Sequence, residues 1–367
     1  MSDRPARTEE EVLDAIELRR RRPVRKLLDD RITLSHGAGG KATHTLVEAL
    51  FLAELRNPLL ETLGDSAVFE VGAGGPRLAF STDSYVVHPL FFPGGDIGEL
   101  AVNGTVNDLA MSGARPLHLS AGFIIEEGFP IPDLQRVVAS MGAAARAANV
   151  AIVTGDTKVV ERGKADGLYV NTAGVGVIER GLDLSSAAVR AGDRVLVSGT
   201  LGDHGTAVMI ARGDLELEVD LESDTASLAG LTADLLDAAG DGVRCLRDPT
   251  RGGLATVLAE LALETELCII IDETALPITP SVHGACEILG LYPLYIANEG
   301  KLAAIVAPEA ADSALAALRS HPLGQDAAIV AEVIDDPDAP GLVLLETAIG
   351  GSRVVDMLAG DPLPRIC

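Results

Sequence analysis

From residue 32 onward, short apolar runs typical of strands alternate with Ala-rich runs typical of helices. The strand candidates are residues 77–87, 117–125, 150–157 and 168–178, and the helix candidates between them are residues 41–55, 96–112 and 132–148. This alternation predicts an α/β (α+β) protein built from packed layers. Aromatic residues make up only 3 % of the chain and Trp is absent, so Ala, Val, Leu and Ile must fill the cores.

The length of 367 residues is sufficient for two domains, each with its own core. The segment "VRAGDRVLVSGTLGDHG" (189–205) marks the opening of a second block rich in strands and helices. We expect an N-terminal domain at 32–180, a C-terminal domain at 181–350 and a flexible tail at 351–367. Residues 1–31 form an extension in which acidic residues precede basic ones, the order that complements a helix dipole. It is a solvated helix, a frayed end, or a docking arm for an acidic partner.

The net charge of −25 argues against nucleic acid and anionic membranes as partners, because both repel an acidic surface. Phosphate ligands remain compatible with this charge when Mg²⁺ accompanies them. No apolar run reaches the roughly 18–20 residues of a membrane span, and no apolar signal segment opens the chain. We therefore expect a cytoplasmic protein.

The chain has four cysteines, whose spacing makes neither a CxxC pair nor a zinc ribbon. Cys268 and Cys286 lie in apolar segments and are expected to be buried packing residues. Cys367 is the last residue, and terminal residues are usually exposed. We therefore expect an exposed terminal thiol.

Neither common nucleotide-binding fingerprint is present, because Lys41 of "HGAGGKATHT" is followed by Ala42 rather than Ser or Thr. Five aspartates instead follow or end apolar runs among small residues: Asp65, Asp83, Asp108, Asp156 and Asp248. A single such residue is ordinarily a turn or N-cap residue. Several together also suit a Mg²⁺ and phosphate site, over which the glycine-rich segment 36–40 could place backbone N–H groups.

Two further residues have alternative interpretations. Lys158 follows Asp156 by two positions, so both would face the same side of a strand. It is either an exposed ion-pair partner or a group that holds a transferring phosphoryl. Glu299 in "YIANEGKL" is either a loop residue or a general base.

Taken together, these motifs resemble the HypE family of [NiFe]-hydrogenase maturation proteins over residues 32–367. The similarity rests on "HGAGG", "STDSYVVHPLFFPGGDIG", "NGTVNDLAMSGA", "TGDTKVVERG", "VSGTLGDHG", "RDPTRGG", "ANEGKL", "HPLG" and the terminal "PLPRIC". That family belongs to the PurM-like group of ATP-binding enzymes. The resemblance implies two α/β domains, a homodimer in which the N-terminal sheets pair into a barrel, and ATP near the subunit interface.

The resemblance also implies roles for individual residues. Metal and phosphate would be held by Asp65, Asp83, Asp108, Asp156 and Asp248, and the nucleotide also by Thr157, Gly39 and Gly40. Cys367, Lys158 and Glu299 would belong to the catalytic site, with His36 as a weaker alternative base. The implied activity is ATP-dependent dehydration of a carbamoyl group on Cys367 to a thiocyanate, with HypF as carbamoyl donor and a HypC–HypD complex as cyanide acceptor.

The tail is consistent with that task. Pro362 and Pro364 favour an extended backbone, and Arg365 either tunes the thiol or docks a partner. Two alternatives remain open at this point: a PurM-like enzyme acting on a free small amide, and a carrier that only presents Cys367. Prenylation is excluded, because that motif places its cysteine four residues from the end.

Overall fold

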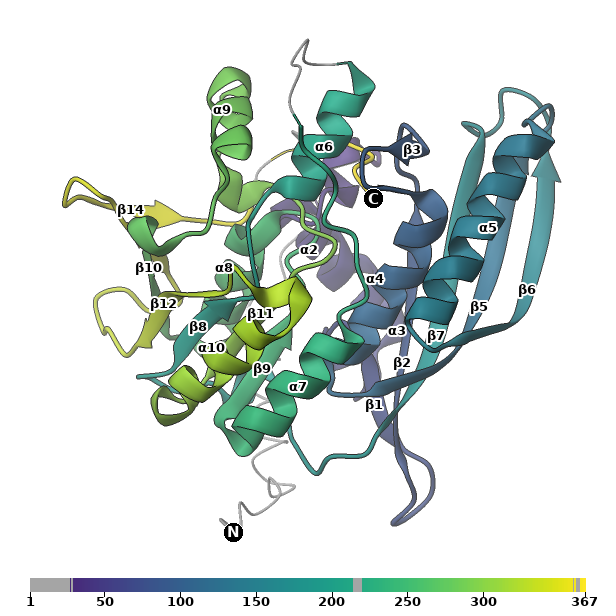
Figure 1. Cartoon of the computed structure of the whole chain (residues 1–367). Helices are drawn as coiled ribbons and strands as arrows, with labels where there is room; N and C mark the ends of the chain where they lie inside the picture. Colours follow the sequence, from purple (N-terminus) through teal and green to yellow (C-terminus); the bar gives the residue numbers. More distant parts are fainter. Residues whose placement is uncertain (1–26, 28, 214–219, 359, 361–363) are drawn as a thin grey trace.

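The computed structural model describes residues 27, 29–213, 220–358, 360 and 364–367. A five-stranded sheet and a seven-stranded sheet lie side by side, each with helices packed on it (Figure 1). This arrangement confirms the α/β architecture with two sheet-based parts. The predicted extension at 1–31 lies almost entirely outside the described residues.

The N-terminal sheet has the strand order β1-β2-β7-β5-β6. Its members are β1 (Ala67–Glu70), β2 (Arg77–Tyr85), β5 (Arg115–Glu126), β6 (Ala151–Val160) and β7 (Leu168–Ile178). Only the β5–β6 pair is parallel, and the other neighbours are antiparallel. All four strands expected in this region are confirmed.

Helices cover one face of this sheet (Figure 1): α4 (Ile97–Met111) and α5 (Ile131–Ala147). The Asp96 carboxylate begins α4 by accepting the N–H groups of Gly98 and Glu99. Nearly every residue of α4 is buried, because it packs on β2 and β7 and also meets helix α5 and strand β9. A short hairpin, β3 (Phe91–Phe92) and β4 (Gly95–Asp96), leads into it.

The segment 41–55 is helical throughout, as expected. It comprises α2 (Lys41–Leu46), a π-helical stretch (Val47–Phe51) and α3 (Leu52–Leu55). The helix predictions at 96–112 and 132–148 are confirmed by α4 and α5.

The C-terminal sheet has the order β14-β13-β10-β12-β8-β11-β9. Its strands are β8 (Arg194–Val197), β9 (Val243–Arg247), β10 (Cys268–Asp272), β11 (Ala303–Val306), β12 (Ala328–Ile334), β13 (Val343–Glu346) and β14 (Ser352–Val355). The helices of this part are α6 (Asp203–Arg212), α7 (Ala229–Ala239), α8 (Gly253–Thr265), α9 (Pro280–Leu289) and α10 (Ala311–Ser320).

Strand β8, inside the C-terminal sheet, is buried on both faces. Val195 and Val197 of β8 enter a core shared with α8, whereas Leu196 enters a second core shared with α7 and α10. Alternate side chains of a strand point to opposite faces, so an unbroken apolar run such as "RVLV" suits a strand covered on both sides.

One boundary prediction requires correction. Residues 351–367 were expected to form a flexible tail, but β14 pairs with β13 from Ser352 to Val355. The alternation of "SRVVDM" allows Val355 and Met357 to join the C-terminal core. Among the described residues, no helix is both long and apolar enough to span a membrane.

Candidate active site

Four of the five predicted aspartates meet between the two sheets. Asp83 lies near the end of β2, Asp108 lies on α4, and Asp248 directly follows β9. Burial raises the pKa of Asp108 well above its usual value, and the neighbouring charges of Asp248, Asp65 and Asp83 raise it further. Burial and the charge of Asp65 likewise raise the pKa of Asp248 to about 8. The carboxylates therefore repel one another, and a cation would relieve that repulsion.

Two groups partly compensate this acidic cluster, which consists of Asp65, Asp83, Asp108 and Asp248. The Arg247 guanidinium, at the end of β9, lies 2.7 Å from an Asp65 oxygen, and the charge of Asp65 raises the arginine pKa. The Ser81 hydroxyl donates to Asp108 at 2.5 Å. Within the described part of the chain, no three His, Cys, Asp or Glu side chains are placed closely enough to hold a metal ion. A preformed cage made of protein groups is therefore absent from that part.

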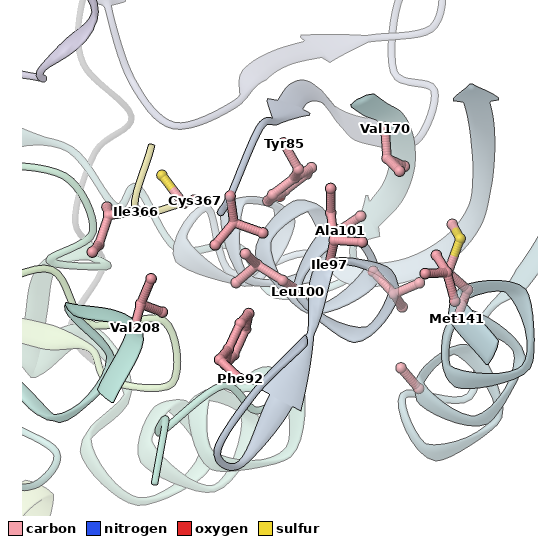
Figure 2. Packing of buried hydrophobic residues seen from close by; sticks show 14 of the residues in the cluster. Tyr85, Phe92, Ile97, Leu100, Ala101, Met141, Val170, Val208, Ile366 and Cys367 are labelled. Atoms are coloured by element: carbon pink, nitrogen blue, oxygen red, sulfur yellow. The ribbon is translucent and has the colours of Figure 1, made fainter. Parts of the chain in front are cut away.

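The C-terminal residues are docked along the end of β2. The Val86 N–H donates to a terminal carboxylate oxygen of Cys367 at 3.0 Å, and the His88 N–H donates to the Arg365 carbonyl at 3.1 Å. His204 of α6 lies with Nε2 2.8 Å from the Ile366 carbonyl oxygen. Figure 2 shows the Ile366 and Cys367 side chains at the margin of the apolar cluster that also contains Val208.

The expectation of an exposed terminal thiol is therefore wrong. Cys367 is 7 % exposed, because the chain end folds back into the gap between the two sheets. Burial raises the pKa of its thiol, the Arg251 charge lowers it, and the charge and hydrogen bond of Glu299 raise it. The docked thiol is thus held protonated and is a poor nucleophile.

Arg365 is engaged within its own chain. Its backbone has φ +55°, its Nε donates to the Val86 carbonyl at 2.9 Å, and its guanidinium forms an ion pair with Asp166. Arg251, and not Arg365, is among the charges with the largest effect on the thiol pKa. In this structure Arg365 fastens the tail to Val86 and Asp166, and a role in tuning the thiol or docking a partner stays a prediction.

Glu299 lies in the loop before β11 and is 3 % exposed. Its N–H donates to an Asp224 carboxylate at 2.9 Å, and its carbonyl accepts from the Asn107 amide at 3.2 Å. Gly300 allows this arrangement, because a Cβ there would lie 1.7 Å from the Asp224 carbonyl oxygen. Burial and the charges of Asp248 and Asp83 raise the pKa of Glu299 well above its usual value. Glu299 is thus a loop residue, and a buried one, while its role as a general base stays a prediction.

The segment carrying Asp156, Thr157 and Lys158 lies elsewhere. All three residues are exposed on β6, the outer edge strand of the N-terminal sheet (Figure 1). Lys158 Nζ lies 2.7 Å from an Asp156 oxygen, which confirms that the two side chains share a face. Strands β7 and β5 lie between β6 and β2, the strand that carries Asp83. The single chain does not bring this segment to the acidic cluster.

The glycine-rich segment packs against protein backbone. A Cβ at Gly39, where φ is +78°, would lie 2.8 Å from the Arg251 carbonyl oxygen, and one at Gly40 would lie 2.1 Å from that of Leu358. The buried His36 ring contacts Thr33, with Nδ1 2.9 Å from its hydroxyl, and Asp29, with Nε2 at 3.4 Å. The described contacts of His36 are thus local, and its role as a base stays a prediction.

Sequence reasoning missed three residues of this site: Arg247, Arg251 and His204. Arg247 and Arg251 lie on either side of Asp248 in "RDPTRGG". Two cations so close to an aspartate of the predicted metal and phosphate site were the signal that could have revealed them. His204 in "LGDHG" carried no such signal, because its role depends on a carbonyl 162 positions away.

Residues 63–178 match the N-terminal domain of AIR synthase related proteins, and residues 190–341 match the C-terminal domain of the same family. The carbamoyl dehydratase HypE of Bradyrhizobium diazoefficiens is 57 % identical to this chain, over 92 % of this chain and 96 % of the relative.

Two solved structures are similar. A crystal structure of a HypE–HypF complex superposes with a TM-score of 0.80 at 47 % identity, covering 85 % of this chain and 99 % of the other. A crystal structure of HypE in complex with ATP superposes with a TM-score of 0.76 at 49 % identity, covering 92 % and 100 %. With this identity over nearly the full length of its relatives, the chain belongs to the carbamoyl dehydratase HypE family of AIR synthase related proteins.

Proposed function

We propose that this chain uses ATP to dehydrate a carbamoyl group carried on its own Cys367, giving a thiocyanate that supplies cyanide to the iron centre of a [NiFe]-hydrogenase. The observation that carries the proposal is the position of the Cys367 thiol, buried beside Glu299 at the acidic cluster. A terminal cysteine placed at a charged centre is suited to act as a substrate. At least six polar contacts hold residues 365–367, which gives the chain end a defined bound position at this site.

The chemistry explains why these groups are needed. The carbamoyl oxygen of Cys–S–C(=O)–NH₂ is a poor leaving group until it attacks the γ-phosphorus of ATP, which releases ADP and gives Cys–S–C(=NH)–O–PO₃²⁻. The remaining N–H proton then leaves, the C–O bond breaks, and hydrogen phosphate and Cys–S–C≡N form. Glu299 is the proposed base that takes protons from the nitrogen, because a carboxyl with a raised pKa transfers protons efficiently near neutral pH. His36 is the weaker alternative.

The acidic cluster fits a Mg²⁺ ion that arrives with the nucleotide. Mg²⁺ is ordinarily held by one or two carboxylates together with substrate phosphates, so the lack of a preformed three-ligand group agrees with this assignment. We assign Asp65, Asp83, Asp108 and Asp248 as candidate ligands, because their mutual repulsion would be relieved by a cation. When bound, the ion would neutralise charge on the phosphates during phosphoryl transfer. We assign ATP as the nucleotide because a HypE relative has been solved in complex with ATP.

A second copy of the chain is the proposed cover for β6. This edge strand has exposed apolar side chains at Ile152, Val153 and Val159, and the same sheet also exposes Phe80 on β2 and Ile124 on β5. A long exposed edge with apolar groups is a template for pairing. We infer a homodimer in which the N-terminal sheets meet and bring Asp156, Thr157 and Lys158 to the nucleotide, with Gly39 and Gly40 shaping the loop beside it.

The tail and the free cysteines lead to proposals for two partners and for a cellular compartment. HypF is the proposed carbamoyl donor, consistent with the HypE–HypF complex of a relative, and a HypC–HypD complex is the proposed cyanide acceptor. Because the docked thiol is buried and protonated, residues 364–367 must leave this position to meet either partner. All four cysteines are free, which suits a reducing compartment such as the cytoplasm.

Mass spectrometry of the C-terminal peptide tests the proposal. After incubation with HypF, carbamoyl phosphate and ATP, the peptide should gain one carbamoyl group and then lose one water. A Cys367→Ala chain should show neither change. A thiocyanate elsewhere in the chain, or ATP consumption unaffected by Cys367→Ala, would contradict it.

A further inference from the structure

We propose that Arg251 binds the oxygen of the carbamoyl group on Cys367 and stabilises the negative charge that this oxygen gains before it attacks ATP. The inference rests on the proposed function. Removal of a proton by Glu299 leaves negative charge on the carbamoyl oxygen, and Arg251 is the residue proposed to stabilise that charge.

The backbone around Arg251 fixes its position. It is followed by Gly252 and Gly253, whose φ values of +81° and +62° make the sharp turn into α8. Arg251 Nη1 donates to the Gly37 carbonyl at 2.7 Å, and Gly39 allows the loop backbone to pass closely over the Arg251 carbonyl. One end of the guanidinium is therefore anchored to the loop 37–39.

The side chain borders a cavity that also contains the thiol. This cavity has a volume of about 160 Å³ and is lined by Arg251, Arg365, Ile366 and Cys367, together with backbone and apolar groups such as Val86 and Tyr295. That volume equals roughly five water molecules, so the cavity is large enough for a carbamoyl group. Arg365 also lines the cavity, but its guanidinium is already bonded to Val86 and Asp166.

Arg251 is exposed in this chain, yet it responds to charges of the reaction centre. The charges that act on it most strongly are those of Cys367, Asp83 and Glu299, and they hold its pKa above its usual value. Lys158, the cation proposed to hold the transferring phosphoryl group, is on β6 and paired with Asp156. Arg251 thus lines the cavity of the thiol and is influenced by the charge of the proposed base.

The proposed role is a defined electrostatic one. When Glu299 removes a proton from the carbamoyl nitrogen, the electron pair is shared with the carbonyl oxygen. Guanidinium N–H groups directed at that oxygen stabilise the resulting anion, as donors do in an oxyanion hole. The oxygen then forms its bond to the γ-phosphorus, ADP departs, and no further reactant is needed.

Single-turnover conversion of carbamoylated protein provides the first test. Removal of one oxyanion donor typically slows catalysis by about 10² to 10³, so we expect a loss of that order for Arg251→Gln. Arg251→Lys keeps the charge but not the forked geometry and should lose less. Nucleotide binding and the melting temperature of both variants should stay near those of wild type, and Arg115→Gln, on an exposed ion pair, serves as the matched control.

Infrared spectroscopy provides a second test that does not require ATP. A ¹³C-labelled carbamoyl group on Cys367 should show its carbonyl band at lower frequency in wild type than in Arg251→Gln, because donated hydrogen bonds weaken the C=O bond. Equal bands, or undiminished turnover of Arg251→Gln, would overturn the role of Arg251 while leaving the proposed function intact. Failure of wild type to form any thiocyanate would instead overturn the proposed function.

Discussion

The acidic cluster and strand β6 carry comparable sets of charged residues in opposite environments. At the cluster, carboxylates from β2, α4 and the turn after β9 are enclosed, and burial raises the pKa values of Asp108, Asp248 and Glu299. On β6, Asp156 and Lys158 are exposed and neutralise each other, and the backbone and side-chain bonds to Asp156 lower its pKa.

The difference shows that the predicted site is divided. The enclosed part is prepared for chemistry within one chain, because its buried charges lack sufficient counter-charge. On β6 the charged side chains are exposed to water and paired with each other. We propose that they act only when a second surface covers this strand. The predictions below test each part separately.

The largest effect is expected at the enclosed part. Glu299→Gln keeps the shape and the backbone contacts to Asp224 but removes the proposed base, so thiocyanate formation should fall by about 10² to 10⁴. Calorimetric titration should still detect ATP binding, and the protein should accumulate in the carbamoylated state. Cyanation at the wild-type rate would remove Glu299 from its assigned role.

A large loss of activity is also expected from a substitution on β6, and co-refolding with a second variant should restore the activity. Lys158→Ala should lose most of the dehydratase turnover, since one cation at a transferring phosphoryl group contributes on the order of 10² or more. If β6 serves the partner's site, co-refolding this variant with Cys367→Ala should restore thiocyanate on the Lys158→Ala chain. Each variant refolded alone is the control, and a mixture that stays inactive would place Lys158 in its own chain's site.

A smaller effect is expected at the fastening of the tail. Arg365→Ala removes the ion pair with Asp166 and the bond to the Val86 carbonyl, so the docked state should become less populated. Iodoacetamide should then label Cys367 roughly tenfold faster, as expected for the loss of charge-assisted bonds. The buried cysteines at 245, 268 and 286 serve as internal references, and an unchanged labelling rate would show that Arg365 does not hold the tail.

The smallest effect concerns pH. Burial lowers the pKa of His204, while Asp224 and the bond to the Ile366 carbonyl raise it; Phe92 and Ser223 complete its surroundings. Because burial is the largest cause, the docked state favours the neutral ring. If release of the tail exposes the ring to water, docking should weaken as the pH falls below the usual value near 6.5.

Labelling of Cys367, relative to a free "DPLPRIC" peptide that corrects for thiolate content, should increase a few-fold between pH 7.5 and 5.5. His204→Gln, which cannot titrate, should abolish this dependence. A pH-dependence that persists in the variant would assign it to another group.

Much of the fold followed from local patterns. The strands and helices of the N-terminal part were predictable because each is a long run with a clear period. Four aspartates could be grouped, since each ends or follows such a run. The burial of Cys367 could not be predicted, because it depends on backbone bonds from Val86 and His88 at the end of β2, far away in the sequence. The separation of Asp156 from the cluster could not be predicted either. It depends on the order of the strands in the sheet, which places β6 at the edge.

The most direct test of the account follows one oxygen atom. The central claim is that the carbamoyl oxygen on Cys367 becomes phosphorylated and departs as phosphate. Protein carrying a carbamoyl group labelled with ¹⁸O should, on addition of ATP, yield one labelled inorganic phosphate for each thiocyanate formed on Cys367. Label recovered in water, with unlabelled phosphate, would contradict the claim.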